Sequence, residues 1–185
     1  MLRANNAWRR GTRGLAFLVA LAASHAFPQG LAEYQVKAAF LFNFARYTEW
    51  PSPGAGGQGV PFSVCIIGRD PFGDALAAIE GKIVHDRPLR VHRGVALDQL
   101  RGCQLLWVSE SEERRLAAIL RAVAPYPVMT LSDIEGFVEA GGMIGLMVVE
   151  ERVRFDVNLA AVRQANLHVS SQVLKLARNV TGVKG

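Results

Sequence analysis

Apolar and polar positions along this chain predict short strands that alternate with helices. Runs in which apolar residues are continuous, or alternate with polar ones, are followed by segments with helical spacing. Ser109 and Glu112 match a capping box that would open the second of these helices. Strands that alternate with helices indicate a mostly parallel sheet with helices on both faces. The expected strands are residues 62–68, 87–94, 103–109 and 126–132, and the expected helices are residues 72–81 and 112–124.

The last third of the chain departs from this alternation. Residues 143–149 and 153–157 both resemble strands, and only residues 150–152 separate them. This connection fits an antiparallel hairpin and is too short for a parallel crossover. A short helix is expected at residues 159–165, followed by a final helix. The predicted fold is a single α/β domain with a mixed, mostly parallel sheet, helices on both faces and a C-terminal antiparallel hairpin.

The most hydrophobic part of the chain after its first thirty residues is KAAFLFNFARYTEW, residues 37–50. Its longest uncharged run is far shorter than the ~20 residues that a membrane-spanning helix needs. Helical spacing relates Val36, Phe40, Phe44 and Tyr47. Because a helix that is apolar nearly all round is usually buried between other elements, this segment is predicted to be a core helix.

The first 26 residues have the order of a secretory signal peptide. Four arginines form a basic start, residues 15–23 form a short apolar run, and small residues lead up to Ala26. Cleavage is expected after Ala26, with Ala32 as the alternative position, and a retained signal anchor is the other interpretation. The working protein is therefore expected to be an exported domain at residues 33–182.

Export changes the charge of the working protein. The formal net charge of the full chain is +5, but four of its 21 basic residues precede Ala26. The remaining 17 basic residues face 16 acidic ones, which leaves a net charge of +1. No basic patch with interleaved aromatic residues remains, so a nucleic-acid partner is not expected.

Two cysteines, Cys65 and Cys103, fall in two of the expected core strands. In an oxidising compartment an even pair of cysteines favours a disulfide. The alternative is that both are small buried hydrophobic residues, a common use of cysteine. The spacing C-x-x-C is absent, so catalytic thiol exchange is not expected.

No catalytic or metal-binding motif stands out. His85, His92 and His168 occupy three separate elements without the spacing of metal ligands, and neither a nucleophile elbow nor a phosphate-binding loop is present. A literal G-x-G-x-x-G occurs at residues 54–59, but it follows a helix and precedes a strand, the reverse of the order in dinucleotide-binding folds. The residues favour a binding or regulatory role, without a metal or cofactor, over an enzyme.

Asp70 and Asp74 lie where the first expected strand meets its helix. Open α/β sheets often bind ligands at this end of a strand, so the two carboxylates are candidates for a ligand pocket. The alternative is that they form a turn and complement the positive end of a helix.

Five longer stretches run through nearly all of the expected exported part. They are EYQVKAAFLFNFARYTEWP, FSVCIIGRDPFGDAL, GKIVHDRPLRV, GCQLLWVSESE and FDVNLAAVRQANLHVSSQVLKLAR. None is a catalytic motif. Together, and in this order, they resemble the YfiR family of periplasmic proteins.

The resemblance implies a compact α/β protein of the periplasm, often a dimer and not an enzyme. The best understood role in the family is to restrain an inner-membrane diguanylate cyclase by binding the periplasmic domain of that enzyme, which lowers cyclic-di-GMP signalling and biofilm formation. An outer-membrane lipoprotein can act as the antagonist that removes the repressor. Because related domains serve as sensory parts of histidine kinases, the alternative is a small-ligand sensor or solute-binding domain that feeds another membrane receptor.

The resemblance also assigns roles to particular residues. The cysteine pair shared by the family matches Cys65 and Cys103 and implies a disulfide, whereas the second pair that some members carry in the C-terminal half is absent here. The FDVNL and SSQVLKLAR signature is expected to form or support a partner surface. Helix capping is the alternative role of its asparagine and serines. The candidate partner-binding residues are Phe155, Asn158, Ser170, Ser171, Leu174 and Lys175.

Overall fold

The computed structural model describes residues 29–51 and 59–183. The predicted signal peptide and its cleavage position after Ala26 lie outside the described residues, as does most of the glycine motif at 54–59. The alternative cleavage position, after Ala32, falls within the first helix.

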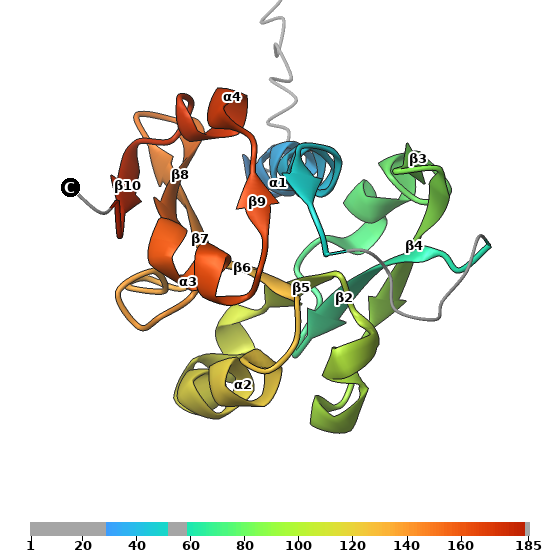
Figure 1. Cartoon of the computed structure of the whole chain (residues 1–185). Helices are drawn as coiled ribbons and strands as arrows, with labels where there is room; N and C mark the ends of the chain where they lie inside the picture. Colours follow the sequence, from blue (N-terminus) through green and yellow to red (C-terminus); the bar gives the residue numbers. More distant parts are fainter. Residues whose placement is uncertain (1–28, 52–58, 184–185) are drawn as a thin grey trace, which may run out of the picture.

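The fold is built on an eight-stranded mixed sheet. Its strands are β2 (Phe62–Ile67), β3 (Ile83–Val84), β4 (Arg87–Arg93), β5 (Leu105–Val108), β6 (Met129–Ser132), β7 (Ile144–Val149), β8 (Arg152–Asn158) and β10 (Asn179–Thr181). Their order in the sheet is β10-β8-β7-β6-β5-β2-β4-β3 (Figure 1). From β4 to β7 all neighbours are parallel, and β7 and β8 form an antiparallel hairpin. The predicted mixed, mostly parallel sheet and its C-terminal hairpin are confirmed.

Helices cover both faces of the sheet, also as predicted (Figure 1). One face carries α1 (Gln29–Arg46), α3 (Leu159–Gln164) and α4 (Ser171–Leu174), and the other carries α2 (Leu116–Val123) with the 3₁₀ helix η2 (Leu97–Gly102). The strands supply both cores because successive side chains point to opposite faces. In β2, Val64 and Ile66 belong to the core under α1, whereas Cys65 and Ile67 belong to the core under α2.

α1 crosses the sheet as a core helix. Its inward side includes Ala38, Leu41 and Phe44, each at most 1% exposed. Of the four apolar residues at helical spacing, Val36 and Tyr47 are exposed, so the apolar stripe of the helix is wider than its buried face. In the part of the chain that the structure describes, no helix is long and apolar enough to cross a membrane.

A second, two-stranded sheet joins the end of α1 to the last third of the chain. β1 (Thr48–Glu49) pairs antiparallel with β9 (His168–Val169), and the Ser170 N–H donates to the Tyr47 carbonyl at 2.9 Å. The short strands β1, β3, β9 and β10 were not predicted from the sequence. Strands of two or three residues are too short to show a periodic pattern.

His85 links the turn between β3 and β4 to the carboxyl end of α1. Its Nε2 lies 3.0 Å from the Ala45 carbonyl and 2.9 Å from the Thr48 carbonyl. With the proton on Nε2, the imidazole donates to both carbonyls, and the Ala45 carbonyl is one that the helix end leaves without an intrahelical partner. His85 and Asp86 have positive φ angles of 47° and 61°, which suits the centre of a two-residue hairpin turn.

Two predicted helices differ in kind from the prediction. η1 (Gly73–Ala78) is a 3₁₀ helix, and the segment after β5 begins as the 3₁₀ helix η3 (Glu110–Arg115) before it continues as α2. The predicted capping box of Ser109 and Glu112 is wrong, because the Ser109 side chain makes no capping hydrogen bond. The buried Ser109 side chain instead lies against Gly68, where a Cβ would come within 3.2 Å of it. Tertiary packing therefore overrides the local capping pattern.

Phe155, one of the signature residues, is predicted to stabilise the core under α1. Its ring contacts Phe44 and Phe40 edge-on, with centroid distances of 5.0 and 5.5 Å, and its residue is 2% exposed. Replacing Phe155 with alanine is expected to lower the free energy of unfolding by about 3–5 kcal/mol, measured by urea denaturation, because a cavity remains under α1. Leu176→Ala, at a position 70% exposed, serves as the control and should change it by less than about 0.5 kcal/mol. A Phe155→Ala loss as small as the control would contradict this placement.

Candidate functional site

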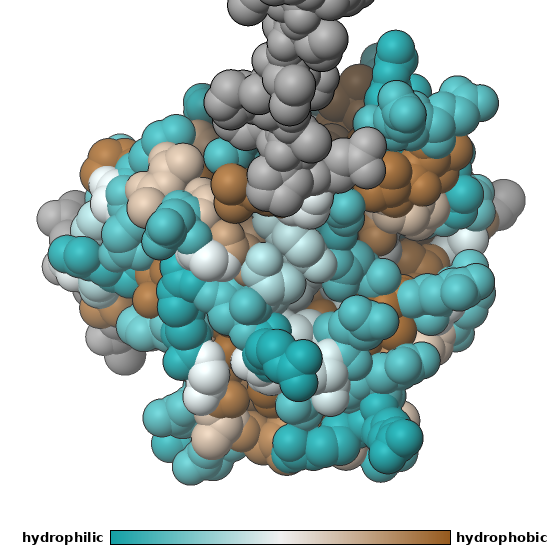
Figure 2. Space-filling model, turned by 180° about the vertical axis from the view of Figure 1, so that it is seen from behind, coloured by the Kyte–Doolittle hydropathy of each residue, from teal (hydrophilic) through white to brown (hydrophobic). Residues whose placement is uncertain are grey.

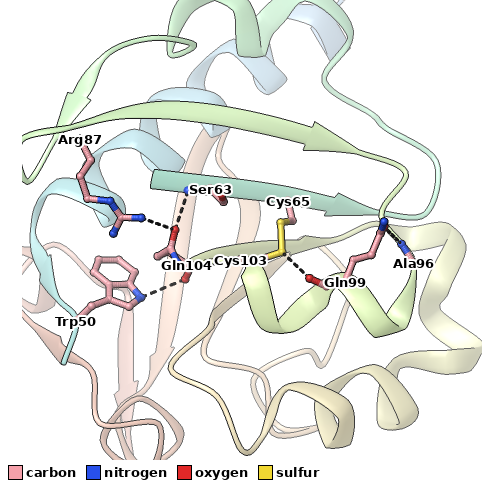
Figure 3. Close-up of a disulfide and its surroundings, with 8 residues drawn as sticks. All are labelled: Trp50, Ser63, Cys65, Arg87, Ala96, Gln99, Cys103 and Gln104. Atoms are coloured by element: carbon pink, nitrogen blue, oxygen red, sulfur yellow. Dashed lines mark hydrogen bonds between the residues drawn. A yellow bond between two sulfur atoms is a disulfide. The ribbon is translucent and has the colours of Figure 1, made fainter. Parts of the chain in front are cut away.

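Cys65 and Cys103 form the predicted disulfide (Figure 3). Cys65 lies within β2, and Cys103 stands where η2 leads into β5. Their Cα atoms are 5.9 Å apart, and the two residues are 2% and 3% exposed. The bond closes a loop over 38 positions and ties the end of η2 to β2.

The residue after Cys103 extends this link to the end of α1. Gln104 exchanges hydrogen bonds with the Ser63 backbone, through its side chain at 2.8 Å and its own N–H at 3.0 Å. Its carbonyl accepts from the Trp50 indole at 3.3 Å (Figure 3). The disulfide and Gln104 together fix the start of β5, so the sequence-predicted cysteines have a clear structural role.

The ligand-pocket alternative rested on Asp70 and Asp74, and the structure does not bring the two carboxylates together in one site. Asp70 follows β2, pairs with Arg93 and accepts from the Phe72 N–H at 2.8 Å. Asp74 is exposed in the first turn of η1. Next to them, the Ser111 hydroxyl accepts from the Arg69 N–H at 2.9 Å and fills the space beside Gly68. A pocket of about 400 Å³ opens at the carboxyl end of β2, but it is lined by Ile67, Gly68, Glu112 and Arg115 among others and by neither aspartate.

The C-terminal signature residues divide into core, caps and surface. Phe155 is core, Asn158 accepts from the Ala161 N–H at 3.0 Å at the start of α3, and Ser170 accepts from the Gln172 N–H at the start of α4. Asn158 and Ser170 therefore cap helices, as the alternative interpretation predicted. Ser171 and Lys175 are exposed, and Leu174 is half-buried.

Of the six candidate residues, Phe155 lines an apolar groove, together with Gln172, Val173 and Leu176 from the same C-terminal stretch. The groove lies between α1 and α4 and has a volume of about 270 Å³. At its floor is Phe155, whereas Tyr47 and Leu176 stand at its exposed margin. We call this surface the α1–α4 groove, lined by Phe40, Asn43, Phe44, Tyr47, Phe155, Gln172, Val173 and Leu176.

A buried charged cluster lies at the other end of α1. The Lys37 ammonium, whose side chain is 3% exposed, contacts Asp133 at 2.6 Å and Glu33 at 2.5 Å. It also lies 4.4 Å from the centre of the Tyr34 ring, whose hydroxyl donates to Asp133 at 2.8 Å. The cluster joins α1 to the loop after β6 across almost a hundred positions of sequence.

This cluster raises the pKa of Tyr34 well above its ordinary value of 10.0. Burial of the ring is the largest cause, followed by the hydrogen bond to Asp133 and by the negative charge of that carboxylate and of two glutamates nearby. The cluster was not predicted from the sequence. A lysine within an apolar helix was the available signal, but nothing local identifies Asp133 as its partner.

These site features all lie on one α/β scaffold. In the described ranges, no group of three or more histidine, cysteine, aspartate or glutamate side chains is arranged to hold a metal ion. Sequence comparison matches residues 34–178 to the YfiR/HmsC-like family, and the chain belongs to that family.

Among solved structures, the chain is similar to a conserved domain protein from Vibrio cholerae O1 biovar El Tor strain N16961. The two share 10% sequence identity with a TM-score of 0.44. The similarity covers 64% of this chain and 54% of the Vibrio protein, so the chain spans about half the length of that relative.

Removing the disulfide should destabilise the fold. Replacing both Cys65 and Cys103 with serine is expected to lower the free energy of unfolding by about 4 kcal/mol, because the unfolded chain regains the freedom that the closed loop removes. Urea denaturation with and without a reductant measures this change. The reductant should weaken the unsubstituted chain and leave the double variant unaffected, and an equal effect on both would contradict the prediction.

Alkaline titration should reveal Tyr34. Its pKa in the folded protein is raised above the unfolded value of 10.0, so its contribution to stability is complete below about pH 10 and is lost as pH rises through the folded pKa. Tyrosinate absorbance of the folded protein should therefore show a late ionisation step that Tyr34→Phe removes. Tyr126→Phe, at an exposed position, is the control and should keep the late step. A late step that survives in Tyr34→Phe would contradict the assignment.

Proposed function

We propose that this protein is a periplasmic regulatory binding protein that restrains an inner-membrane diguanylate cyclase through the periplasmic domain of that enzyme, and so lowers cyclic-di-GMP signalling. Membership of the YfiR/HmsC-like family supports a regulatory role of this kind. The N-terminal sequence, with its basic start and short apolar run, supports export to the periplasm.

The observation that carries the proposal is the α1–α4 groove. Two of the stretches that resemble the YfiR family, the first helix and the C-terminal signature, meet at this surface. Binding energy at protein interfaces is concentrated in aromatic and apolar anchors set in well-packed pockets. Tyr47 and Leu176 are 41% and 70% exposed at the margin of the groove, where a partner would cover them.

The proposal gives the signature residues two kinds of role. Phe155, Asn158 and Ser170 position the groove from beneath and from the helix ends, whereas Ser171, Leu174 and Lys175 lie on or beside α4, where a partner would bind. We further propose that an outer-membrane lipoprotein antagonist competes for the same surface. A homodimer is compatible with this arrangement if its interface leaves the groove open.

Cellular cyclic-di-GMP tests the proposal in the native host. Deletion of the gene should raise the cyclic-di-GMP concentration, and the full chain should restore it, whereas a version without residues 1–26 should not. A chain with Leu176→Glu should restore it poorly because a charge would enter the apolar groove. No rise on deletion would overturn the proposed repression.

A matched variant separates the groove from surface hydrophobicity in general. Ile83 is 59% exposed on β3, at the opposite edge of the sheet, so Ile83→Glu makes the same kind of change away from the groove. It should restore cyclic-di-GMP as well as the unsubstituted chain does. If Leu176→Glu restores it equally well, the groove is not the partner surface. Melting curves of both variants verify that each folds.

A further inference from the structure

The β7–β8 hairpin projects beyond the strand beside it. β7 pairs with β8 along all six of its residues, but it pairs with β6 only through Ile144 and Gly145. Within the described residues, the other edge of β7 therefore has no strand partner over positions 146–149. An unpaired strand edge presents backbone N–H and C=O groups that another extended chain can pair with.

The geometry of the hairpin shows which groups this edge offers. Glu150 and Glu151 form a two-residue turn with positive φ angles, so Val149 and Arg152 close the hairpin as its first pair. Hydrogen-bonded and non-hydrogen-bonded pairs alternate along antiparallel strands. Val148, opposite Val153, is therefore in a non-hydrogen-bonded pair and directs its N–H and C=O away from β8, toward the open edge.

This edge lines a second cleft, which is larger than the α1–α4 groove. The cleft has a volume of about 860 Å³ and includes the four consecutive residues 146–149 together with the loop 133–139. Side chains of consecutive strand residues point to opposite faces, so a cleft that touches all four is bounded by the strand edge itself. Val148 is 49% exposed, and from behind the molecule an apolar patch is visible at the upper right, near the hairpin, with hydrophilic surface around it (Figure 2).

The walls of the cleft carry negative charge. Glu110, Glu135 and Glu139 are exposed and have no ion-pair partner in the described part of the chain. The two basic side chains of the lining are already engaged, Lys37 by Glu33 and Asp133, and Arg178 by Asp156. A positively charged occupant would therefore find carboxylates that the protein itself leaves without a counter-charge.

We infer that the open edge of β7 accepts an extended segment of a partner protein, with alternating basic and apolar residues, as an added strand. Main-chain hydrogen bonds to the edge would supply affinity. Apolar side chains of the segment would face Met147 and Val149, and its basic side chains would meet the glutamates. The cleft shares no lining residue with the α1–α4 groove, so this inference stands apart from the proposed function.

Charge also excludes a second copy of this chain at the same edge. Natural proteins usually protect an open edge with a lysine, a proline or a bulge, whereas positions 146–149 are Leu, Met, Val and Val. Two such edges brought together would bring two sets of unpaired glutamates together, and like charges repel. The acidic walls therefore protect the edge from self-pairing and leave it open to a basic segment.

Peptide binding to the purified full chain tests the inference. The probe is a fluorescein-labelled hexapeptide of alternating lysine and valine, and fluorescence anisotropy measures its affinity. Val148→Pro removes the N–H that points to the open edge, and it should weaken binding about tenfold because the peptide loses backbone hydrogen bonds. Val153→Pro is the matched control. It sits opposite in the same non-hydrogen-bonded pair, directs its N–H to the far edge of β8, and should bind like the unsubstituted chain.

Two further comparisons keep the test independent of folding defects. A peptide with N-methyl groups on its pairing edge should bind about tenfold more weakly to the unsubstituted chain, because it cannot donate to β7. Glu135→Gln with Glu139→Gln should also weaken binding and reduce its dependence on salt, whereas Asp98→Asn with Glu113→Gln, exposed elsewhere, should not.

The outcomes separate the alternatives. Absence of binding by the lysine–valine peptide overturns the inference. Equal binding by the N-methylated peptide or by Val148→Pro also overturns it, because the cleft would then attract a cation without using the strand edge. Binding that depends on both the edge and the glutamates supports an added basic strand.

Discussion

The ion pair between Lys37 and Asp133 determines where α1 lies on the sheet. Lys37 is 2% exposed, so its charge has left water and depends on Asp133, Glu33 and the Tyr34 ring. Breaking a buried pair by removing one partner typically costs about 3–5 kcal/mol, because an uncompensated charge remains. This constraint fixes α1 at the carboxyl end of β6. From this position α1 covers the larger core and lines both the α1–α4 groove and the acidic cleft.

The cross-links of the fold and its two candidate binding surfaces lie in different halves of the sheet. The disulfide, Gln104 and Trp50 join β2, β5 and the end of α1 at one side of the sheet. The α1–α4 groove and the acidic cleft lie along the other half, where β7 and β8 continue beyond β6. Binding surfaces on a fixed scaffold lose little conformational entropy when a partner binds, which favours affinity.

Local patterns predicted the parts of the fold whose signal is local. The continuous apolar run of β5 and the three-residue joint at Glu150 indicated a parallel core strand and an antiparallel hairpin, and both are present. Predictions from local sequence patterns failed where contacts with distant residues determine the structure. Ser109 packs against Gly68 instead of capping its helix, and β9 is a strand only because Thr48 and Glu49 lie beside it.

The same distinction applies to the candidate sites. The cysteine pair was predictable because a chain with only two cysteines, for which export is expected, allows a single pairing. The partner surface was predicted as six signature residues, of which Phe155 is core, Asn158 and Ser170 are caps, and only Phe155 lines the α1–α4 groove. The open edge of β7 was beyond prediction, because it arises from how few residues β6 contributes to the pairing. No pattern within the hairpin carries that information.

The contacts that hold α1 on the sheet have a consequence for the order of folding. α1 is the first described element to be synthesised, and although Phe72 and His85 contact it from the first half of the chain, Asp133 and Phe155 contact it from the second half. Contacts between positions so far apart in sequence slow folding, because a long loop must close before they form. Part of the apolar side of the helix, including Phe40 and Phe44, therefore stays uncovered until the chain has emerged as far as Phe155. Truncation of the chain before β8 would leave this part of the helix exposed, even though the first half of the fold could form.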